Sequence, residues 1–74
     1  MLVVLREREL EPAWVARVLS DPEWTEPDPN DPELTRAFAA VAERGGRLLR
    51  VVYRDDGTTP FVVTAFFDRG ARRP

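Results

Sequence analysis

Arginine is the residue type in this chain best suited to chemistry. All eleven basic residues are Arg, and the sequence contains no Lys, His or Cys. A high-GC genome is the simplest explanation, and selection for planar guanidinium donors, which bind phosphate in pairs of hydrogen bonds, is the alternative. Four arginines are candidates for binding nucleic acid, namely Arg47, Arg50, Arg54 and Arg69. Without His or Cys the chain lacks an imidazole base, a thiolate nucleophile and the usual zinc ligands, so we expect no metal and no cofactor.

Two of these arginines lie in one expected strand, in the stretch RLLRVVYRD. Arg50 and Arg54 are four residues apart, which places them on the same face of a strand at about 13 Å, a spacing that suits consecutive phosphates. Tyr53 then points to the opposite face and shares no pocket with Arg50 unless a bulge intervenes. The alternative for Arg50 and Arg54 is a solvated face, or ion pairs with the acidic segment 21–33, and we favour it.

Other polar candidates also have plain structural interpretations. Asp68 and Arg69 are expected to form an ion pair that holds the end of the last strand, although Asp68 could also orient a reacting group. Tyr53 is more simply an aromatic residue at the edge of the core with a solvated hydroxyl.

The charges are sorted along the chain. Residues 21–43 hold seven acidic residues against Arg36 alone, whereas residues 44–74 hold seven arginines against three aspartates. The net charge is −2 and the pI is near 5.0. A dipolar molecule of this kind is not expected to bind nucleic acid strongly by charge alone.

A β-hairpin over residues 47–68 organises the fold. Two runs rich in Val, Phe and Tyr flank the turn sequence DDGTTP, which is typical of a hairpin. A helix is expected from Pro12, which suits a first helical position, with Glu11 as cap and with Leu10 and Val15 as a hydrophobic staple. Its apolar stripe requires a sheet to cover it, and Asp21-Pro22 should end it. Residues 2–9 fit a helix or a strand equally well.

Residues 34–44 carry conflicting signals. Asp31 as cap, Pro32 at the first position and an apolar spacing of 34-37-38-41 favour a helix. A two-stranded hairpin is marginal without a third strand, however, so we predict a strand over 35–42 followed by a tight turn. The predicted fold is α+β, with one or two N-terminal helices on a three-stranded antiparallel sheet. The single domain then comprises a helical region 1–20, an acidic Pro-rich loop 21–33, a β-meander 34–69 and a tail 70–74.

The apolar pattern also raises the question of an interface. Strict alternation places Val62 and Phe66 on the face opposite Ala65 and Phe67, and a strand that is apolar on both sides suggests a subunit interface. We therefore expect a homodimer or a partner that covers Val62 and Phe66. Trp24, in the Pro-rich loop, either folds onto the edge of the core or anchors a partner, and the first is favoured.

Three stretches carry a family resemblance. They are RERELEPAWVARVLSDPE, EPDPNDPELTRAF and GGRLLRVVYRDDGTTPFVVTAFFDR, and together they resemble a bacterial family of domains of unknown function with the fold of RelE/ParE-type toxins. The most specific positions are Gly46-Arg47 and Leu49 to Val52, followed by Val63 to Arg69. A His near the start of family members would fall at or before Met1 here, so either the true start lies upstream or the chain resembles an N-terminally shortened member. That departure weighs against His-dependent chemistry.

The resemblance implies a toxin of a toxin–antitoxin pair that acts on RNA or the translation machinery. RelE-like members cleave messenger RNA using Arg, Lys and Tyr side chains on the sheet, so the implied catalytic candidates are Arg50, Tyr53, Arg54 and Arg69 for a metal-independent endoribonuclease. Implied partners are an antitoxin protein and RNA or the ribosome. The alternatives are a non-catalytic partner-binding module and an acidic decoy that occupies a basic nucleic-acid site. With no apolar run near the roughly 20 residues of a membrane span, we expect a cytoplasmic protein with no membrane partner.

Overall fold

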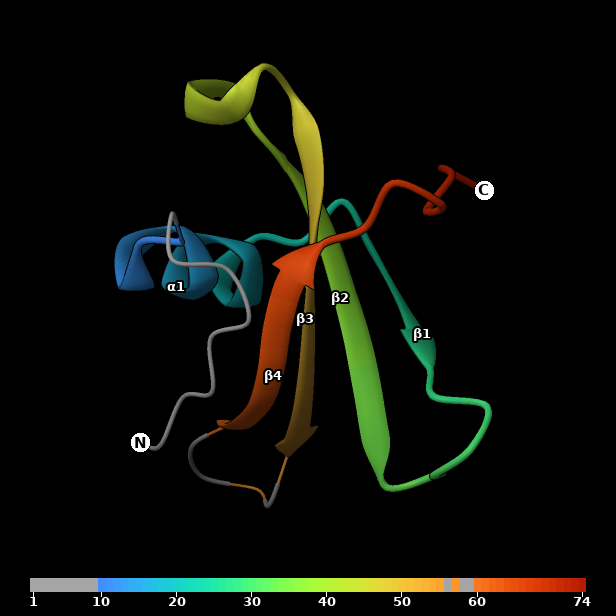
Figure 1. Cartoon of the computed structure of the whole chain (residues 1–74). Coiled ribbons are helices and arrows are strands. Elements are labelled where there is room, and N and C mark those ends of the chain that lie inside the picture. Colours follow the sequence, from blue (N-terminus) through green and yellow to red (C-terminus); the bar gives the residue numbers. More distant parts are fainter. Residues whose placement is uncertain (1–9, 56, 58–59) are drawn as a thin grey trace.

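The computed structural model describes residues 10–55, 57 and 60–74 (Figure 1). One helix, α1 (Pro12–Ser20), packs against one face of a four-stranded sheet. The strands are β1 (Trp24–Pro27), β2 (Leu34–Val41), β3 (Arg47–Asp55) and β4 (Pro60–Phe67), and they run antiparallel in the order β1-β2-β3-β4. The α+β class is confirmed, whereas the expected count of three strands is wrong. The segment 2–9, for which helix and strand were equally plausible, lies outside the described residues.

Helix α1 begins and ends where its sequence indicates. Pro12 occupies the first turn after Glu11, whose extended backbone serves as the N-cap without a side-chain hydrogen bond. The helix ends at Ser20, because Pro22 keeps Asp21 out of the helical region. Trp14, Val15 and Val18 form its buried stripe.

Strand β1 corrects the expectation that 21–33 is only a loop. Trp24 pairs with Phe38 and Pro27 with Thr35, although the strand itself ends in a proline. The turn that follows is built by aspartates: Asp28 Oδ1 accepts hydrogen bonds from the backbone N–H groups of Asn30 and Asp31. Such local Asp-to-backbone bonds stabilise turns, and here they return the chain into β2.

Strand β2 confirms the predicted strand over the competing helix. It is followed by a short 3₁₀ turn at Ala42–Arg44 and by Gly45 and Gly46, with φ angles of 70° and 79°. Glycine adopts this left-handed backbone with little strain, so the pair supplies the tight connection into β3. Arg17 of α1 donates to Glu43 in this turn at 3.0 and 2.8 Å and so joins the helix to the end of the sheet.

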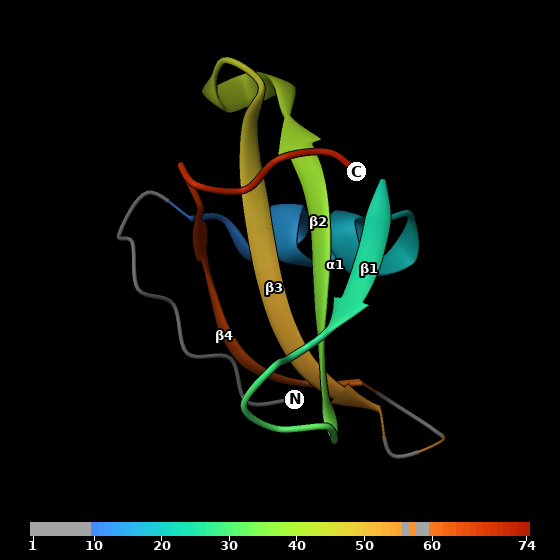
Figure 2. The same cartoon turned by 90° about the vertical axis from the view of Figure 1, so that its right-hand side faces the viewer.

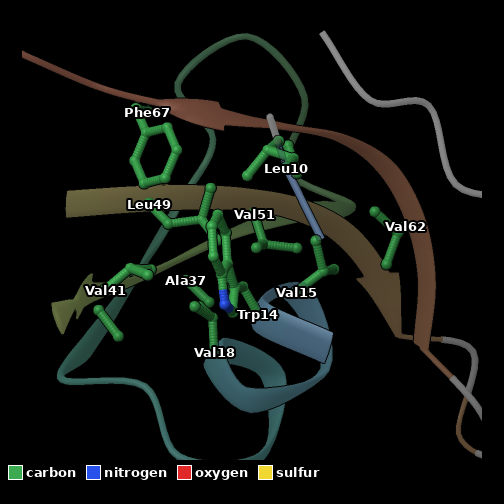
Figure 3. Close-up of a cluster of buried hydrophobic side chains, with 12 residues drawn as sticks. Leu10, Trp14, Val15, Val18, Ala37, Val41, Leu49, Val51, Val62 and Phe67 are labelled. Atoms are coloured by element: carbon green, nitrogen blue, oxygen red, sulfur yellow. The ribbon is translucent and has the colours of Figure 1, made fainter. Parts of the chain in front are cut away.

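The hydrophobic core lies between α1 and the sheet. Its largest fully buried side chains include Val15 and Val18 from the helix and Leu49, Val51 and Val62 from the sheet, and Figure 3 shows the helix and strand residues facing one another. Leu10, just before α1, is buried in the same cluster as Val15, as expected for the staple. Tyr53 packs against this cluster, on the face opposite Arg50, as predicted.

Val62 belongs to this core, and its predicted place beside Phe66 is wrong. Val52 pairs with Thr64 but Tyr53 pairs with Val62, so the register shifts by one residue and passes over Val63. The extra residue reverses the alternation along the first half of β4. Val62 is therefore fully buried against the helix side and is not available to a partner in this conformation.

Candidate nucleic-acid interface

The sheet face opposite α1, which we call the open face, carries a row of four side chains that crosses all four strands. The register pairs Trp24 with Phe38, Phe38 with Arg50, and Arg50 with Phe66. Figure 2 views the sheet from this side, with α1 behind it. One guanidinium group thus lies in a row of three aromatic rings.

Arg50 is the centre of this row. Its guanidinium carbon lies 4.8 Å from the ring centroid of Phe66 and 5.8 Å from that of Phe38, within cation–π range. The same group forms an ion pair with Asp68. Its buried Nε has no hydrogen-bond partner within residues 10–55, 57 and 60–74. Arg50 is therefore held on the open face, and one of its donors, the buried Nε, is left unsatisfied.

Asp68 is charged because its partners outweigh its burial. Burial raises the pKa of the Asp68 carboxyl, but the hydrogen bonds from Arg50 and from the backbone N–H of Gly70 bring the net pKa below its ordinary value. Asp68 thus pairs with Arg50 across the strands, and the expected Asp68–Arg69 pair is not formed.

The C-terminal segment 68–73, which we call the strap, crosses the open face. It leaves β4 at Asp68, whose backbone N–H donates to the carbonyl of Leu48 at 3.0 Å. It then passes in front of β3 and β2 towards the start of β1, as the red segment in Figure 2 shows. There Arg73 donates to both carboxylate oxygens of Glu23, at 2.6 and 3.2 Å. The expected tail is thus a bridge between the two edges of the sheet.

Two hollows flank the strap. The first, which we call the arginine hollow, has a volume of about 320 Å³ and is lined by Gly46, Arg47, Phe67, Arg69 and Arg73 among others. The second, the strap hollow, has a volume of about 360 Å³ and lies between the strap and the aromatic row. Asp68 and Ala71 line both, so the two hollows are neighbours along the strap.

Arg47 and Arg69 give the arginine hollow its charge. Within the described ranges, neither guanidinium forms an ion pair. Arg47 lies over the ring of Phe67 at 5.6 Å from its centroid. Two of the four arginines predicted to bind nucleic acid are therefore brought together with their charge available.

The other two predicted arginines, Arg50 and Arg54, each face an acidic side chain, and Arg54 lies away from the two hollows. Arg54 is at the far end of β3, where it faces Glu33 at 3.9 Å, in line with the favoured pairing with the acidic segment. Arg36 is also paired with the acidic segment, with Asp28 at 3.3 Å and Glu26 at 3.8 Å. Arg50 and Arg54 therefore do not form one phosphate track.

Sequence reasoning missed three residues of this face: Arg36, Phe38 and Arg72. The alternation of Arg36 and Phe38 with Ala37 and Ala39 in β2 could have placed the first two on one face. Nothing in the sequence indicates that Arg72 returns over the sheet. Trp24, for which core edge and partner anchor were the alternatives, stacks on Phe38 at the open face, with ring centroids 4.6 Å apart and planes within 8°.

Among the described residues, no group of three His, Cys, Asp or Glu side chains is arranged to hold a metal ion. In that same part of the chain, none of the helices has the length and the apolar character that crossing a membrane requires.

Comparison with known proteins gives a family and nothing finer. No curated protein matches the chain, and no solved structure does. The family model of a domain of unknown function, DUF4258, matches residues 1–67 and so includes α1 and all four strands but not the strap. The chain therefore belongs to the DUF4258 family of domains of unknown function.

Proposed function

We propose that this protein is a toxin-like RNA-binding protein that acts on RNA or the translation machinery. The observation that carries the proposal is the pair Arg47 and Arg69, two cations without ion-pair partners in the described ranges, in one hollow at the end of the sheet. Guanidinium groups that are not paired with carboxylates are available for phosphate. The resemblance to RelE/ParE-type toxins adds the biological setting, in which an antitoxin protein would be a partner.

The geometry favours binding over catalysis. Metal-free RNA cleavage requires a group that activates the 2′-hydroxyl beside cations that stabilise the phosphorane. Tyr53 packs against the helix-side core, whereas Arg50 lies on the open face, so these two candidates cannot act on one phosphate. Arg69 remains in the site as a phosphate-binding cation. The simpler form of the proposal is therefore that the protein acts by binding RNA and not by cleaving it.

The charge distribution shapes the expected affinity. The net charge is −2, and several arginines are already paired with acids. Non-specific attraction to nucleic acid is therefore weak. Binding must come from a small number of local contacts, which suits a single-stranded segment rather than the continuous backbone of a duplex.

The experiment is induced expression in a bacterial host, with growth and bulk translation followed for the wild type and for Arg47→Ala/Arg69→Ala. We expect growth arrest by the wild type and its relief in the double variant. Arg54→Ala is the matched control, because it removes one exposed Arg that faces Glu33 at the other end of β3. A folded wild type that leaves growth and translation unchanged would overturn the proposal, as would equal relief by the control.

A further inference from the structure

We infer that the strap hollow binds one unpaired nucleobase, next to the phosphate position in the arginine hollow. The inference rests on the proposed RNA-binding function and names the part of the ligand that the second hollow takes. It is carried by three features of the strap hollow: its aromatic floor, the state of its charges and its position along the strap.

The floor is a stacked aromatic pair. Trp24 and Phe38 lie nearly parallel, and Phe38 is almost fully buried with 2% of its surface exposed. Trp24 is only partly buried and itself lines the hollow, so part of its indole is exposed there. Stacking on aromatic side chains is the general way in which proteins hold unpaired bases.

The charges of the strap hollow fit a base edge better than a second phosphate. Arg36 and Arg50 both line it, but Arg36 is paired with Asp28 and Glu26, and Arg50 with Asp68. What remains is a mixture of donors and acceptors. Arg72, which lines the hollow and has no ion-pair partner in the described ranges, can donate, and the Glu26 carboxylate can accept. Base edges present donors and acceptors side by side.

Size and position agree with this assignment. A volume of about 360 Å³ is at the small end of ligand pockets. Arg72, in the strap, forms the opposite wall and has no ion-pair partner in the part of the chain that the structure describes. Since the two hollows share Asp68 and Ala71, a base in one is adjacent to a phosphate in the other.

The test is nuclear magnetic resonance on the wild-type protein, which has two indole N–H signals from its two tryptophans. The variant Trp24→Phe assigns them. We titrate guanosine, adenosine, cytidine and uridine, with ribose 5-phosphate as the probe that has the sugar and phosphate but no base. We expect at least one nucleoside to shift the Trp24 signal in a saturable way, while Trp14, buried on the other side of the sheet, serves as the internal control. No saturable shift with any nucleoside, or an equal shift with ribose 5-phosphate, would overturn the inference.

A variant pair makes the test independent of one signal. Trp24→Ala should weaken nucleoside binding, observed on the ligand by saturation transfer, by about 5-fold to 160-fold, the usual range for loss of a stacking ring. Trp24→Tyr should restore most of it, and circular dichroism verifies that both variants are folded. Equal binding by folded Trp24→Ala would overturn the inference.

The two proposals fail in different ways. Nucleosides carry no phosphate, so their binding does not report on the arginine hollow. RNA binding that depends on Arg47 and Arg69, without any response of Trp24 to nucleosides, would remove only the base site. A Trp24 response without RNA binding would remove only the proposed function.

Discussion

Arg73 donates hydrogen bonds to both carboxylate oxygens of Glu23, fifty residues earlier in the chain. Glu23 also accepts a hydrogen bond from the backbone N–H of Ala40 at 2.7 Å, so one carboxylate joins the strap, β2 and the start of β1. The hydrogen bond from Arg73, then that from Ala40, lowers the pKa of Glu23. The strap is thereby anchored at its far end by a group that stays charged.

Removal of this anchor should release the strap without unfolding the domain. In Arg73→Ala we expect faster amide hydrogen exchange at Gly70 and Ala71, whose N–H groups donate to Asp68, and little change in melting temperature, because exposed ion pairs contribute little to stability. Arg72→Ala is the control, since no described residue forms an ion pair with it. Identical exchange rates in both variants would show that the Arg73–Glu23 pair does not hold the strap.

RNA binding should depend on salt through the arginine hollow. For single-stranded RNA, each phosphate contact contributes roughly 0.7 to the slope of log K against log salt concentration. Loss of both Arg47 and Arg69 should lower that slope by about 1.4, again by the single-strand value. Fluorescence anisotropy with a short labelled oligonucleotide measures it over a range of salt. Arg54→Ala should leave the slope near that of the wild type, and a larger effect there would move the phosphate contact to the other end of β3.

Glu43 should make stability depend on pH in the acid range. The hydrogen bonds from Arg17, together with one from its own backbone, lower the pKa of Glu43 from 4.5 to about 2. Because the folded pKa is below the unfolded value, the stabilisation is present above pH 4.5 and is lost as the pH falls towards 2. Urea unfolding at several pH values should show a shallower decline in Glu43→Gln over this window. Arg17→Gln should give a similarly shallow decline, and a wild-type slope in both variants would mean that the pair contributes nothing.

Leu49 should be one of the most sensitive core positions. It is fully buried in β3, and a Leu→Ala change in a packed core costs about 2–5 kcal/mol. A chain this small has a slim margin of stability, so Leu49→Ala should be largely unfolded on heating above room temperature. Leu48→Ala removes the same atoms from a half-buried neighbour and should cost less. Equal losses in chemical denaturation would contradict the assignment of the core to the helix side.

The homodimer remains a prediction, with Phe66 as its test. Phe66 lies on the open face beside Arg50, whereas Val62, the other proposed contact on β4, is buried in the core. If the open face joins two copies, Phe66→Glu should convert a dimer into a monomer in light scattering. A wild type that is already monomeric at high concentration, or a dimer that tolerates the change, would exclude this interface.

The sequence predicted the elements whose signals are local. Pro12 and Pro22 bracket the helix, and the hairpin follows from two β-rich runs around a turn. The predicted strand over 35–42 corresponds to β2 at 34–41, and it was predicted because the hairpin required a neighbour, a tertiary argument that outweighed local helix signals. Strand β1 was missed because it has only four residues and lies in an acidic, Pro-rich stretch that suggests a loop.

The site was less predictable, because it depends on side-chain partners. Tyr53 was correctly placed opposite Arg50 by strand alternation. Alternation failed at Val62, since one bulged residue reverses it and leaves no mark in the sequence. The sequence also did not indicate which arginines would lack an ion-pair partner. Asp68 could pair with Arg69 or with Arg50, and it is the fold that brings it to Arg50.

The strap has a mechanical consequence. It begins at Asp68, directly after the last residue matched to the family, and it ties the end of β4 to the start of β1. A force applied to the C-terminus would therefore act first on the Arg73–Glu23 and Arg50–Asp68 pairs, and only afterwards on the hydrogen bonds of β4. A protein fused to the C-terminus would therefore transmit force to the strap, which covers the strap hollow, before it affected the hydrophobic core.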